Sequence, residues 1–443
     1  MKWLWGVTLL AVTLAYWVSL TPSEQTLAPW ALRKSLLYYA GVMAMVMMSV
    51  GMVLSLRTPW LENLTGGLDR NYRLHKWVGI SGMVFALLHW FIKVEPKSLV
   101  QQGWVSAQIF ETPSGIADFF ADPNPFVALK SVAKTAGEWS IYILAALVLI
   151  ALLKWIPYRR FFKTHRIMPV VYLVLVFHSV VLFGKLGWAS PVGVLTGLLM
   201  AIGSVAAILS LTRRIGARRR FQGEVVQHVE HQSDGVTQID IKMHDDWPGH
   251  LPGQFAFLTL DPKEGGHPFS IASEHSLGEN VVRFYIKHLG DYTNTLAQAV
   301  HTGQLAIIEG PYGRFSFKPA QARQIWIAGG VGVTPFISEL EHLVNQNDAV
   351  PEIDLYLCVR DDSASLTKRA LQLAAKVGVR AHVIASGSGN TLNAQRILEA
   401  HPDWKDAHFW FCGPSGLGQA IRQPLVKLGL PASHFHQELF EMR

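Results

Sequence analysis

The stretch LHKWVGISGMVFALLHW, residues 74–90, is apolar enough to lie in a lipid bilayer, yet it carries a histidine near each end, His75 and His89. The chain has 18 histidines, and before residue 220 the only others are two in a second apolar stretch, THRIMPVVYLVLVFHS, residues 164–179. Ionisable side chains are rare inside membrane segments and usually serve a function there. These two stretches therefore decide both the fold class and the kind of site to expect.

Apolar residues are unevenly distributed along the chain. Half of the 443 residues are hydrophobic, and charge-poor runs dominate the first half, whereas charges return from Phe221 onward. A helix needs about 20 apolar residues to cross a bilayer. We therefore predict a six-span helical membrane half followed by a soluble half. The predicted spans cover residues 3–20, 36–56, 77–92, 139–153, 167–184 and 186–212.

Lysine and arginine placement predicts the orientation of the spans. Basic residues cluster between spans two and three, between spans four and five, and in RRIGARRR at residues 213–220, and they are sparser on the opposite side. The positive-inside rule then places both termini and the soluble half in the cytoplasm, beneath a bacterial-type inner or plasma membrane. The net charge of +7 mostly reflects these anchors, so it gives no argument for nucleic-acid binding.

The first apolar segment resembles a signal peptide, but no good small-residue cleavage site follows it, so a retained span is expected. The two cysteines, Cys358 and Cys412, both lie in the soluble half. They are too few for a disulfide framework or a cysteine-ligated iron–sulfur cluster.

The spacing of the membrane histidines predicts two pairs. His75 and His89 are fourteen residues apart, which on a regular helix places them within about 40° of each other and about 21 Å apart in height. His165 and His178 are thirteen residues apart and would be about 140° out of phase unless Pro169 kinks the helix between them. Both spans are predicted to run outward, so one pair lies at each of two depths.

Two facing neutral imidazoles are the axial ligands that a six-coordinate haem iron needs. Four unrelated interfacial histidines are the simpler explanation, and zinc is the other metal to consider. Nothing acidic or thiolate shares these depths, and the matched spacings on two spans favour ligands over scattered residues. We therefore predict one haem iron between His75 and His165 and a second between His89 and His178.

The soluble half carries a flavin-like motif. In HPFSIAS, residues 267–273, Ser270 supplies a hydroxyl that can hydrogen-bond a flavin ring nitrogen, Phe269 offers a flat apolar wall, and His267 can donate near phosphate. In GDYTNTL, residues 290–296, Thr293 begins a predicted helix whose N-terminus suits a pyrophosphate.

A second group of motifs suggests a nicotinamide cofactor. GGVGVTP, residues 329–335, places glycines between a strand and a helix, where the backbone can approach dinucleotide phosphates. It lacks the third glycine of the usual fingerprint, so an ordinary turn between strand and helix would look the same. CGP, residues 412–414, follows a later predicted strand and is equally weak by itself.

Together and in this order, with EGPYGRFS at residues 309–316, these motifs resemble the ferredoxin–NADP reductase-type flavoprotein module. With the six-span, four-histidine half in front, the chain resembles the NADPH oxidase and ferric reductase family. The resemblance implies a membrane α-helical six-span di-haem bundle followed by a soluble FAD-binding β-barrel and an α/β doubly wound nicotinamide-binding domain. The expected boundaries are 1–212 for the membrane domain, 213–220 for a basic linker, 221–318 for the barrel and 319–443 for the NAD(P)-binding domain.

The resemblance also implies roles for individual residues. Catalytic roles beside the flavin and nicotinamide rings fall to Ser270, Cys412 and Phe440, the last as the C-terminal aromatic that covers the flavin, although the chain continues three residues beyond it. Cofactor-binding roles fall to residues that match the family's motifs. These are His267, Pro268, Phe269, Ser270, Tyr292, Thr293, Gly330, Gly332, Thr334, Pro335, Cys412, Gly413 and Pro414.

The implied activity is that of an NAD(P)H-dependent transmembrane reductase. Cytoplasmic NAD(P)H would reduce FAD, and electrons would pass through two b-type haems to an extracytoplasmic acceptor. A ferric chelate and dioxygen, which would form superoxide, both remain open as acceptors, as does a periplasmic redox partner. The outer loop at residues 93–135 carries no motif that names the acceptor. A proton-relay transporter without enzymatic activity is disfavoured by the flavin and nicotinamide motifs.

The residues expected at the adenosine ribose give opposite indications on whether NADPH or NADH is preferred. The adenosine ribose is usually recognised at the end of the second strand of a dinucleotide fold, here residues 353–359, which lead into Arg360, Asp361 and Asp362. Arg360 could pair with a 2′-phosphate, the aspartates would repel it, and all three could equally be solvated loop residues. The family resemblance favours NADPH, with NADH tolerated.

Overall fold

The chain divides into two structural units, which are described separately. The helical unit extends to Ile215, apart from residues 67–69, and the second unit begins at Gly216. The structure is a computed structural model. It describes residues 2–22, 25, 28–110, 126–153, 155–183, 187–275, 280–318, 323–346, 350–360, 364–388 and 391–438.

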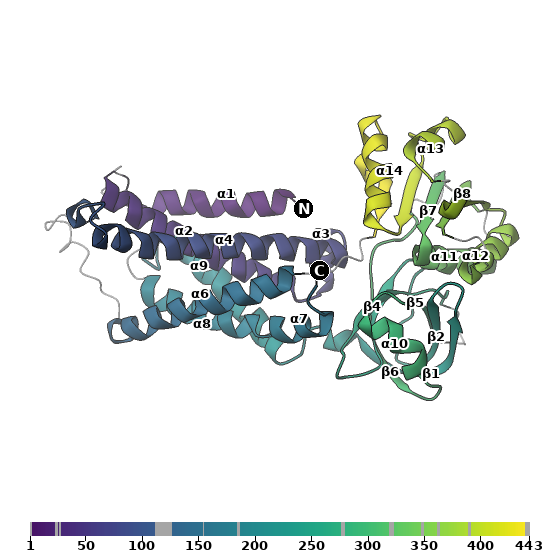
Figure 1. Ribbon diagram of the computed structural model, residues 1–443, viewed down its shortest axis with the longest axis horizontal. Helices are drawn as coiled ribbons and strands as arrows, with labels where there is room; N and C mark the ends of the chain where they lie inside the picture. Colours follow the sequence, from purple (N-terminus) through teal and green to yellow (C-terminus); the bar gives the residue numbers. More distant parts are fainter. Residues whose placement is uncertain are drawn as a thin grey trace. The chain divides into compact units, whose positions relative to one another are not determined.

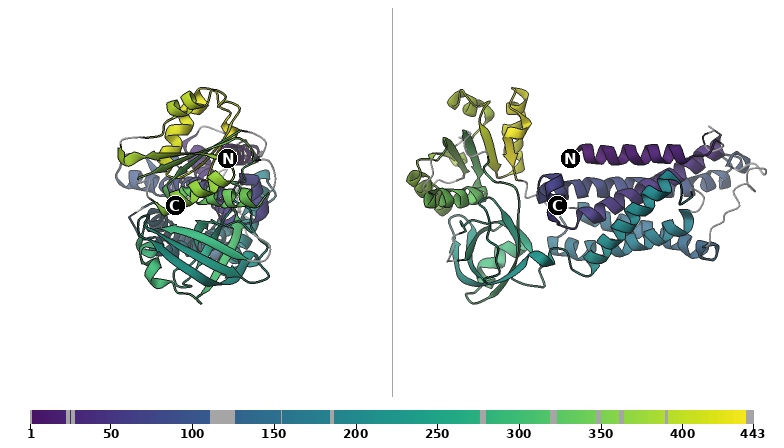
Figure 2. Two further views of the ribbon diagram at one scale, coloured as in Figure 1. Left: turned by 90° about the vertical axis from the view of Figure 1, so that its right-hand side faces the viewer. Right: turned by 180° about the vertical axis from the view of Figure 1, so that it is seen from behind.

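The helical unit consists of long apolar helices that run side by side (Figures 1 and 2). Packing is closest between α2 and α9 and between α6 and α8. Proline opens α2, α3 and α9, where a missing N–H costs nothing. The helices are α1 (Lys2–Ser19), α2 (Pro29–Leu54), α3 (Pro59–Thr65), α4 (Leu68–Gln101), α6 (Lys130–Leu152), α7 (Tyr158–His165), α8 (Met168–Leu182) and α9 (Pro191–Leu211).

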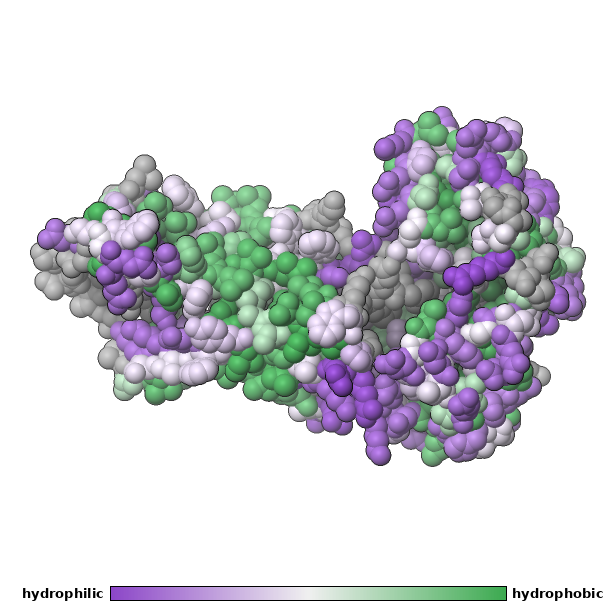
Figure 3. Space-filling model, viewed as in Figure 1, coloured by the Kyte–Doolittle hydropathy of each residue, from purple (hydrophilic) through white to green (hydrophobic). Residues whose placement is uncertain are grey.

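Five segments of the described chain are long and apolar enough to cross a membrane. They are Pro29–Leu54, Leu68–Gln101, Lys130–Leu152, Arg159–Leu182 and Pro191–Leu211. The first predicted span forms a shorter apolar helix, Leu4–Ser19, so the count of six spans stays a prediction. Large apolar side chains occupy much of the middle of this unit on the face that Figure 3 shows, and Trp77 is 60% exposed. Such exposure is expected where lipid replaces water as the surrounding medium.

The first part of the second unit is a six-stranded antiparallel sheet that curves strongly (Figure 2). Its strand order is β4-β3-β6-β1-β2-β5, and a bridge between Ile271 and Phe284 links the two edges of the sheet. The interior is apolar, with Ile239 and Phe284 fully buried. The elements are β1 (Arg220–His231), β2 (Val236–Met243), β3 (Phe255–Thr259), β4 (His267–Ser270), β5 (Val281–Lys287), α10 (Asp291–Ala299) and β6 (Leu305–Tyr312).

The second part is a five-stranded parallel sheet with the order β11-β10-β7-β8-β9. Alternate residues of β7 enter different cores: Trp326 packs with α11 and α12, whereas Ile327 packs with α13 and α14 on the other face. The elements are β7 (Gln324–Gly329), α11 (Thr334–Asn345), β8 (Ile353–Val359), α12 (Ser365–Lys376), β9 (Arg380–Ala385), α13 (Ala394–Ala400), β10 (His408–Cys412), α14 (Ser415–Lys427) and β11 (Phe435–Gln437).

Candidate functional site

The four membrane histidines lie in two facing pairs. The ring centres of His75 and His165 are 6.0 Å apart, and those of His89 and His178 are 6.4 Å apart. A metal–imidazole bond is about 2.0–2.1 Å long; with roughly 1.15 Å from each nitrogen to its ring centre, two coaxial ligands of one metal have centres about 6.3 Å apart. Each pair therefore has the separation that a single metal ion with two axial imidazoles requires.

The pairing of His165 with His75 depends on a break in the fifth span. Helix α7 ends at His165, and α8 begins at Met168 with Pro169 in its first turn. The thirteen-residue phase of a regular helix therefore does not apply to this histidine. The kink that the sequence suggested at Pro169 is present as an interruption just before the proline.

Backbone carbonyls orient three of the four imidazoles. A carbonyl oxygen can only accept, so each of these rings carries its proton on Nδ1 and leaves Nε2 free as a ligand. The bonds run from His75 Nδ1 to Gly51 O (2.9 Å), from His89 Nδ1 to Leu37 O (2.9 Å) and from His178 Nδ1 to Ala133 O (2.7 Å). By contrast, Nδ1 of His165 is buried without a hydrogen-bond partner among the described residues.

Two glycines make room for the outer pair, and sequence reasoning missed both. A Cβ on Gly41 would lie 3.0 Å from Nδ1 of His89, and a Cβ on Gly137 would overlap the His178 ring. Each glycine lies on a helix that also supplies the carbonyl for that histidine. Glycines are common in membrane helices, so only the tertiary contacts distinguish these two.

No group of three or more histidine, cysteine or acidic residues suited to a metal ion occurs in the described part of the chain. A haem needs only two protein ligands, because its porphyrin supplies the other four. The donor set of neutral imidazoles in apolar helices therefore fits haem iron better than it fits zinc.

The two predicted flavin segments lie together in the second unit. The His267 ring on β4 stacks on Tyr292 of α10, with ring centres 4.4 Å apart and planes 15° from parallel. Thr293 Oγ1 accepts hydrogen bonds from the backbone N–H groups of Leu289 and Gly290, which orders the start of α10. The helix begins at Asp291, close to the predicted start.

The stacked His267 and Tyr292 side chains are both uncharged at neutral pH. Burial lowers the pKa of His267, so its imidazole is uncharged at neutral pH. Burial, with the nearby carboxylates of Glu264 and Asp261, raises the pKa of Tyr292 to about 12, so its phenol keeps its proton and can donate to a phosphate. The backbone of the partly exposed Ser270 is paired in the β3–β4 ladder, but its hydroxyl has no hydrogen bond to another described residue and is available.

The two glycine motifs of the nicotinamide domain pack directly on each other. A Cβ on Gly332 would overlap the carbonyl oxygen of Cys412, and one on Gly329 would lie 2.6 Å from Cδ of Pro414. The motifs follow β7 and β10, which are adjacent in the sheet. The chain order of the strands reverses between them, and ligands of open α/β sheets bind at such switch points, beyond the carboxyl ends of the strands.

The other predicted site residues differ in how far they are buried. Cys412 is 1% exposed, and burial raises the pKa of its thiol well above the usual value, so it is no thiolate nucleophile. Arg360 is exposed just after β8, the neighbour of β7 in the sheet. Asp361, Asp362 and Phe440 lie outside the described residues.

Sequence reasoning also missed Lys287 at the end of β5. Its Nζ would lie 3.7 Å from a Cβ on Gly330, a residue with a φ of +56°, so a barrel lysine reaches the nicotinamide-domain loop. The alternation of β5 contains the available signal, because Val282 and Phe284 face the barrel interior and residue 287 faces outward.

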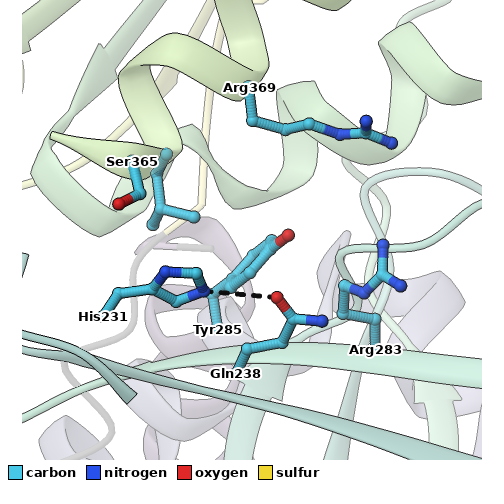
Figure 4. A pocket seen from close by; sticks show the side chains of 7 residues that line it. His231, Gln238, Arg283, Tyr285, Ser365 and Arg369 are labelled. Carbon is cyan, nitrogen blue, oxygen red and sulfur yellow. Dashed lines mark hydrogen bonds between the residues drawn. The ribbon is translucent and has the colours of Figure 1, made fainter. Parts of the chain in front are cut away.

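One cavity of this unit lies away from the flavin and glycine motifs. It has a volume of about 360 Å³ and is lined by His231, Gln238, Arg283, Tyr285, Ser365, Leu366 and Arg369 (Figure 4). Its two arginines are already paired, Arg283 with Asp240 at 2.9 and 2.8 Å and Arg369 with Glu341 at 2.9 Å. The cavity therefore offers no uncompensated charge to an anion.

Paired histidines in apolar helices, joined to an antiparallel sheet and a parallel sheet with glycine loops, define a membrane oxidoreductase with flavin and nicotinamide domains. Residues 40–176 match the family described as a ferric reductase like transmembrane component, residues 224–316 an FAD-binding domain and residues 326–423 an oxidoreductase NAD-binding domain. This combination matches the NADPH oxidase and ferric reductase family, which confirms the resemblance found in the sequence.

Curated relatives share part of the chain. A flavohemoprotein of Oceanobacillus iheyensis is 26% identical over 248 residues, which cover 51% of this chain and 61% of the relative. The anthranilate 1,2-dioxygenase electron transfer component of Acinetobacter baylyi is 25% identical over 228 residues, 49% of this chain and 66% of the relative. The chain thus spans less than two thirds of either relative's length.

Solved structures show only a distant likeness. The flavohemoglobin of Malassezia yamatoensis is 18% identical, with a TM-score of 0.47 over 94% of this chain and 99% of that one. The FAD/NAD-binding domain of a Vibrio cholerae nitric oxide dioxygenase is 21% identical, with a TM-score of 0.42 over 49% of this chain and 97% of that one. At these scores we draw no conclusion from either structure.

Proposed function

We propose that this protein is a transmembrane reductase that carries electrons from cytoplasmic NAD(P)H, through FAD and two b-type haems, to an extracytoplasmic acceptor. The main support is the two facing histidine pairs in the apolar helices, with ring centres 6.0 and 6.4 Å apart. The same chain also has FAD- and NAD-binding domains. When bound, FAD accepts a hydride and releases electrons singly, as haem iron requires.

In the membrane half, the protein's contribution is ligand geometry. His75 and His165 would hold the inner iron, and His89 and His178 the outer one. The carbonyl bonds to Nδ1 keep three rings in the tautomer that ligates through Nε2. With His89 and His178 both holding the outer iron, a small acceptor would find no free ligand position on it and would have to accept the electron without binding to the metal.

In the soluble half, the chain supplies walls and phosphate donors. The stacked His267 and Tyr292, with Pro268 and Phe269 on the same strand, would flank the flavin, while Ser270 would reach the ring and Thr293 the pyrophosphate. The family's C-terminal aromatic corresponds to Phe440 here.

The nicotinamide cofactor would lie on the paired glycine motifs. Gly330, Gly332, Thr334 and Pro335 would receive its phosphates at the start of α11. Cys412, Gly413 and Pro414 would lie beside the nicotinamide, where the protonated thiol acts as a neutral contact. Arg360 would read the adenosine ribose.

The proposed limits are 1–212 for the membrane domain, 213–220 for the linker, 221–318 for the FAD-binding domain and 319–443 for the NAD(P)-binding domain. Helix α1 would be retained as the first of six spans. The flavoprotein half would lie on the cytoplasmic face of a bacterial-type inner or plasma membrane, as the basic loops indicate.

The deciding experiment uses the purified, FAD-supplemented full chain in detergent or nanodiscs. Its reduced-minus-oxidised spectrum should show low-spin b-type haem at two haems per chain. NAD(P)H-driven superoxide and ferrous iron, measured in parallel with a ferric chelate present, would identify the acceptor. A preparation that takes up FAD and oxidises NAD(P)H but never contains haem would contradict the proposal.

A further inference from the structure

The five arginines of the basic linker do not share one environment. Arg214 and Arg218 are exposed, as expected for a membrane-surface segment. Arg219 is half-buried and the Arg220 side chain is 41% exposed, but both contact the strand β6 motif EGPY of the second unit. The linker is therefore partly built into the flavin-binding barrel.

Glu309 is the centre of these contacts. It is only 6% exposed, and its carboxylate accepts from Nε of Arg220 at 2.9 Å and from the hydroxyl of Tyr312 at 3.1 Å. Burying a carboxylate without such partners costs folding free energy. Loss of the arginine would therefore leave an unpaired buried charge, and loss of the carboxylate would release the arginine. Arg220 also begins β1, where it pairs directly with Glu309 across the β1–β6 ladder.

Two further contacts hold the preceding residues. The guanidinium of Arg219 lies over the Tyr312 ring, 5.1 Å from its centre, and donates from Nη1 to Pro311 O at 3.2 Å. Gly216, with a φ of +69°, passes so close to Glu309 that a Cβ there would overlap the carboxylate. We call Gly216, Arg219, Arg220, Glu309 and Tyr312 the linker clasp.

The clasp shortens the tether between the last span and the barrel. Helix α9 ends at Leu211, and the clasp begins at Gly216, so four residues, 212–215, connect them. Four extended residues reach at most about 14 Å. If the clasp opened and freed residues 216–220, the tether would be nine residues long and could reach about 31 Å.

We propose that the linker clasp is a positioning device that keeps the flavin domain within short reach of the membrane half; this inference rests on the proposed function. In that function, NAD(P)H is oxidised to NAD(P)⁺ and one proton, and its two electrons reduce two ferric haem irons one after the other. Electron tunnelling slows steeply with distance, so a longer tether should slow haem reduction without slowing hydride transfer to FAD.

The first test is rapid-mixing spectroscopy on full-length Glu309→Gln without oxygen. Flavin bleaching should stay within about twofold of wild type, while the growth of the ferrous haem band should slow by at least about tenfold. An unchanged haem rate overturns the inference, and so does an equal slowing of both phases, because that would place Glu309 in the flavin site. Asp240→Asn is the matched control: it breaks another buried pair of the barrel, with Arg283, and leaves the linker intact.

The second test needs neither haem nor acceptor. Trypsin cleaves after arginine, so in the wild type it should cut the linker after the exposed Arg214 and Arg218. It should not cut after the half-buried Arg219, nor after Arg220, whose backbone is held in the β1–β6 ladder although its side chain is exposed. Glu309→Gln should add cuts after Arg219 and Arg220. Identical patterns in both proteins overturn the clasp even if electron transfer occurs, whereas added cuts in a protein without haem sustain the clasp and refute the proposed function instead.

Discussion

The two halves of this protein build their sites from different parts of the chain. In the helical unit the candidate ligands are side chains, for example His178, whose Nδ1 bonds to Ala133 O. In the second unit the candidate site is largely backbone, as where Gly332 packs against the carbonyl of Cys412. Membrane helices satisfy their backbone groups internally, so only side chains are left to bind, whereas turns between strands and helices leave backbone N–H groups free.

This difference has a mutational consequence. Removing one side chain should abolish a whole cofactor in the membrane half but cost only part of the binding in the flavoprotein half. Adding a single Cβ in a glycine loop should damage the flavoprotein half severely, because it displaces the backbone that forms the candidate site.

The largest expected effect tests the membrane side. The double variant His89→Leu/His178→Leu should lose one of two haems and about half of the Soret absorbance, because the outer iron has no axial ligand left. His89→Leu alone should give a similar loss. Haem extracted and quantified per chain is the measurement, and two haems retained in the double variant would show the assignment to be wrong.

Adding one methyl group tests the backbone side. Gly332→Ala places a Cβ against the Cys412 carbonyl, which cannot move without shifting β10. We expect NAD(P)H-driven flavin reduction to fall by about a hundredfold, or about 2.7 kcal/mol, with FAD still bound. Gly416→Ala is the control, since a Cβ there meets nothing within 4 Å. Equal kinetics in the two variants would remove this loop from the cofactor site.

A smaller effect is expected where one side chain supplements the backbone. Arg360→Ala should lower kcat/KM for NADPH by about tenfold, or 1.4 kcal/mol, and leave NADH nearly unchanged, because only the 2′-phosphate needs the guanidinium. Steady-state rates with both cofactors measure this. An equal change for both, or no change, would place Arg360 in solvent.

The smallest effect concerns a single neutral hydrogen bond. Ser270→Ala should slow flavin reduction by about fivefold, since such a bond contributes about 1 kcal/mol net, and FAD should remain bound. Rapid-mixing kinetics at saturating NAD(P)H are the measurement. If the rate is the same as in wild type, the hydroxyl does not contact the reactive ring.

The sequence by itself was sufficient for the order of the domains, and it predicted the pairing of the histidines. Apolar runs, basic loops and motif order are local properties, and fourteen residues of helix place His75 and His89 on one face whatever the rest of the chain does. The motif spacing likewise led to the family that the comparisons confirmed. The first span stays a prediction, because its apolar helix, Leu4–Ser19, is shorter than the other five.

Only the tertiary structure decided how those residues meet. The break after His165 replaces the regular phase that would have turned it about 140° away from His178. Gly137, Lys287 and Glu309 gain their importance from elements distant in sequence, and the only local signal is the strand alternation that turns Lys287 outward. Contacts of this kind depend on how helices and strands pack, which residue spacing along a single element does not encode.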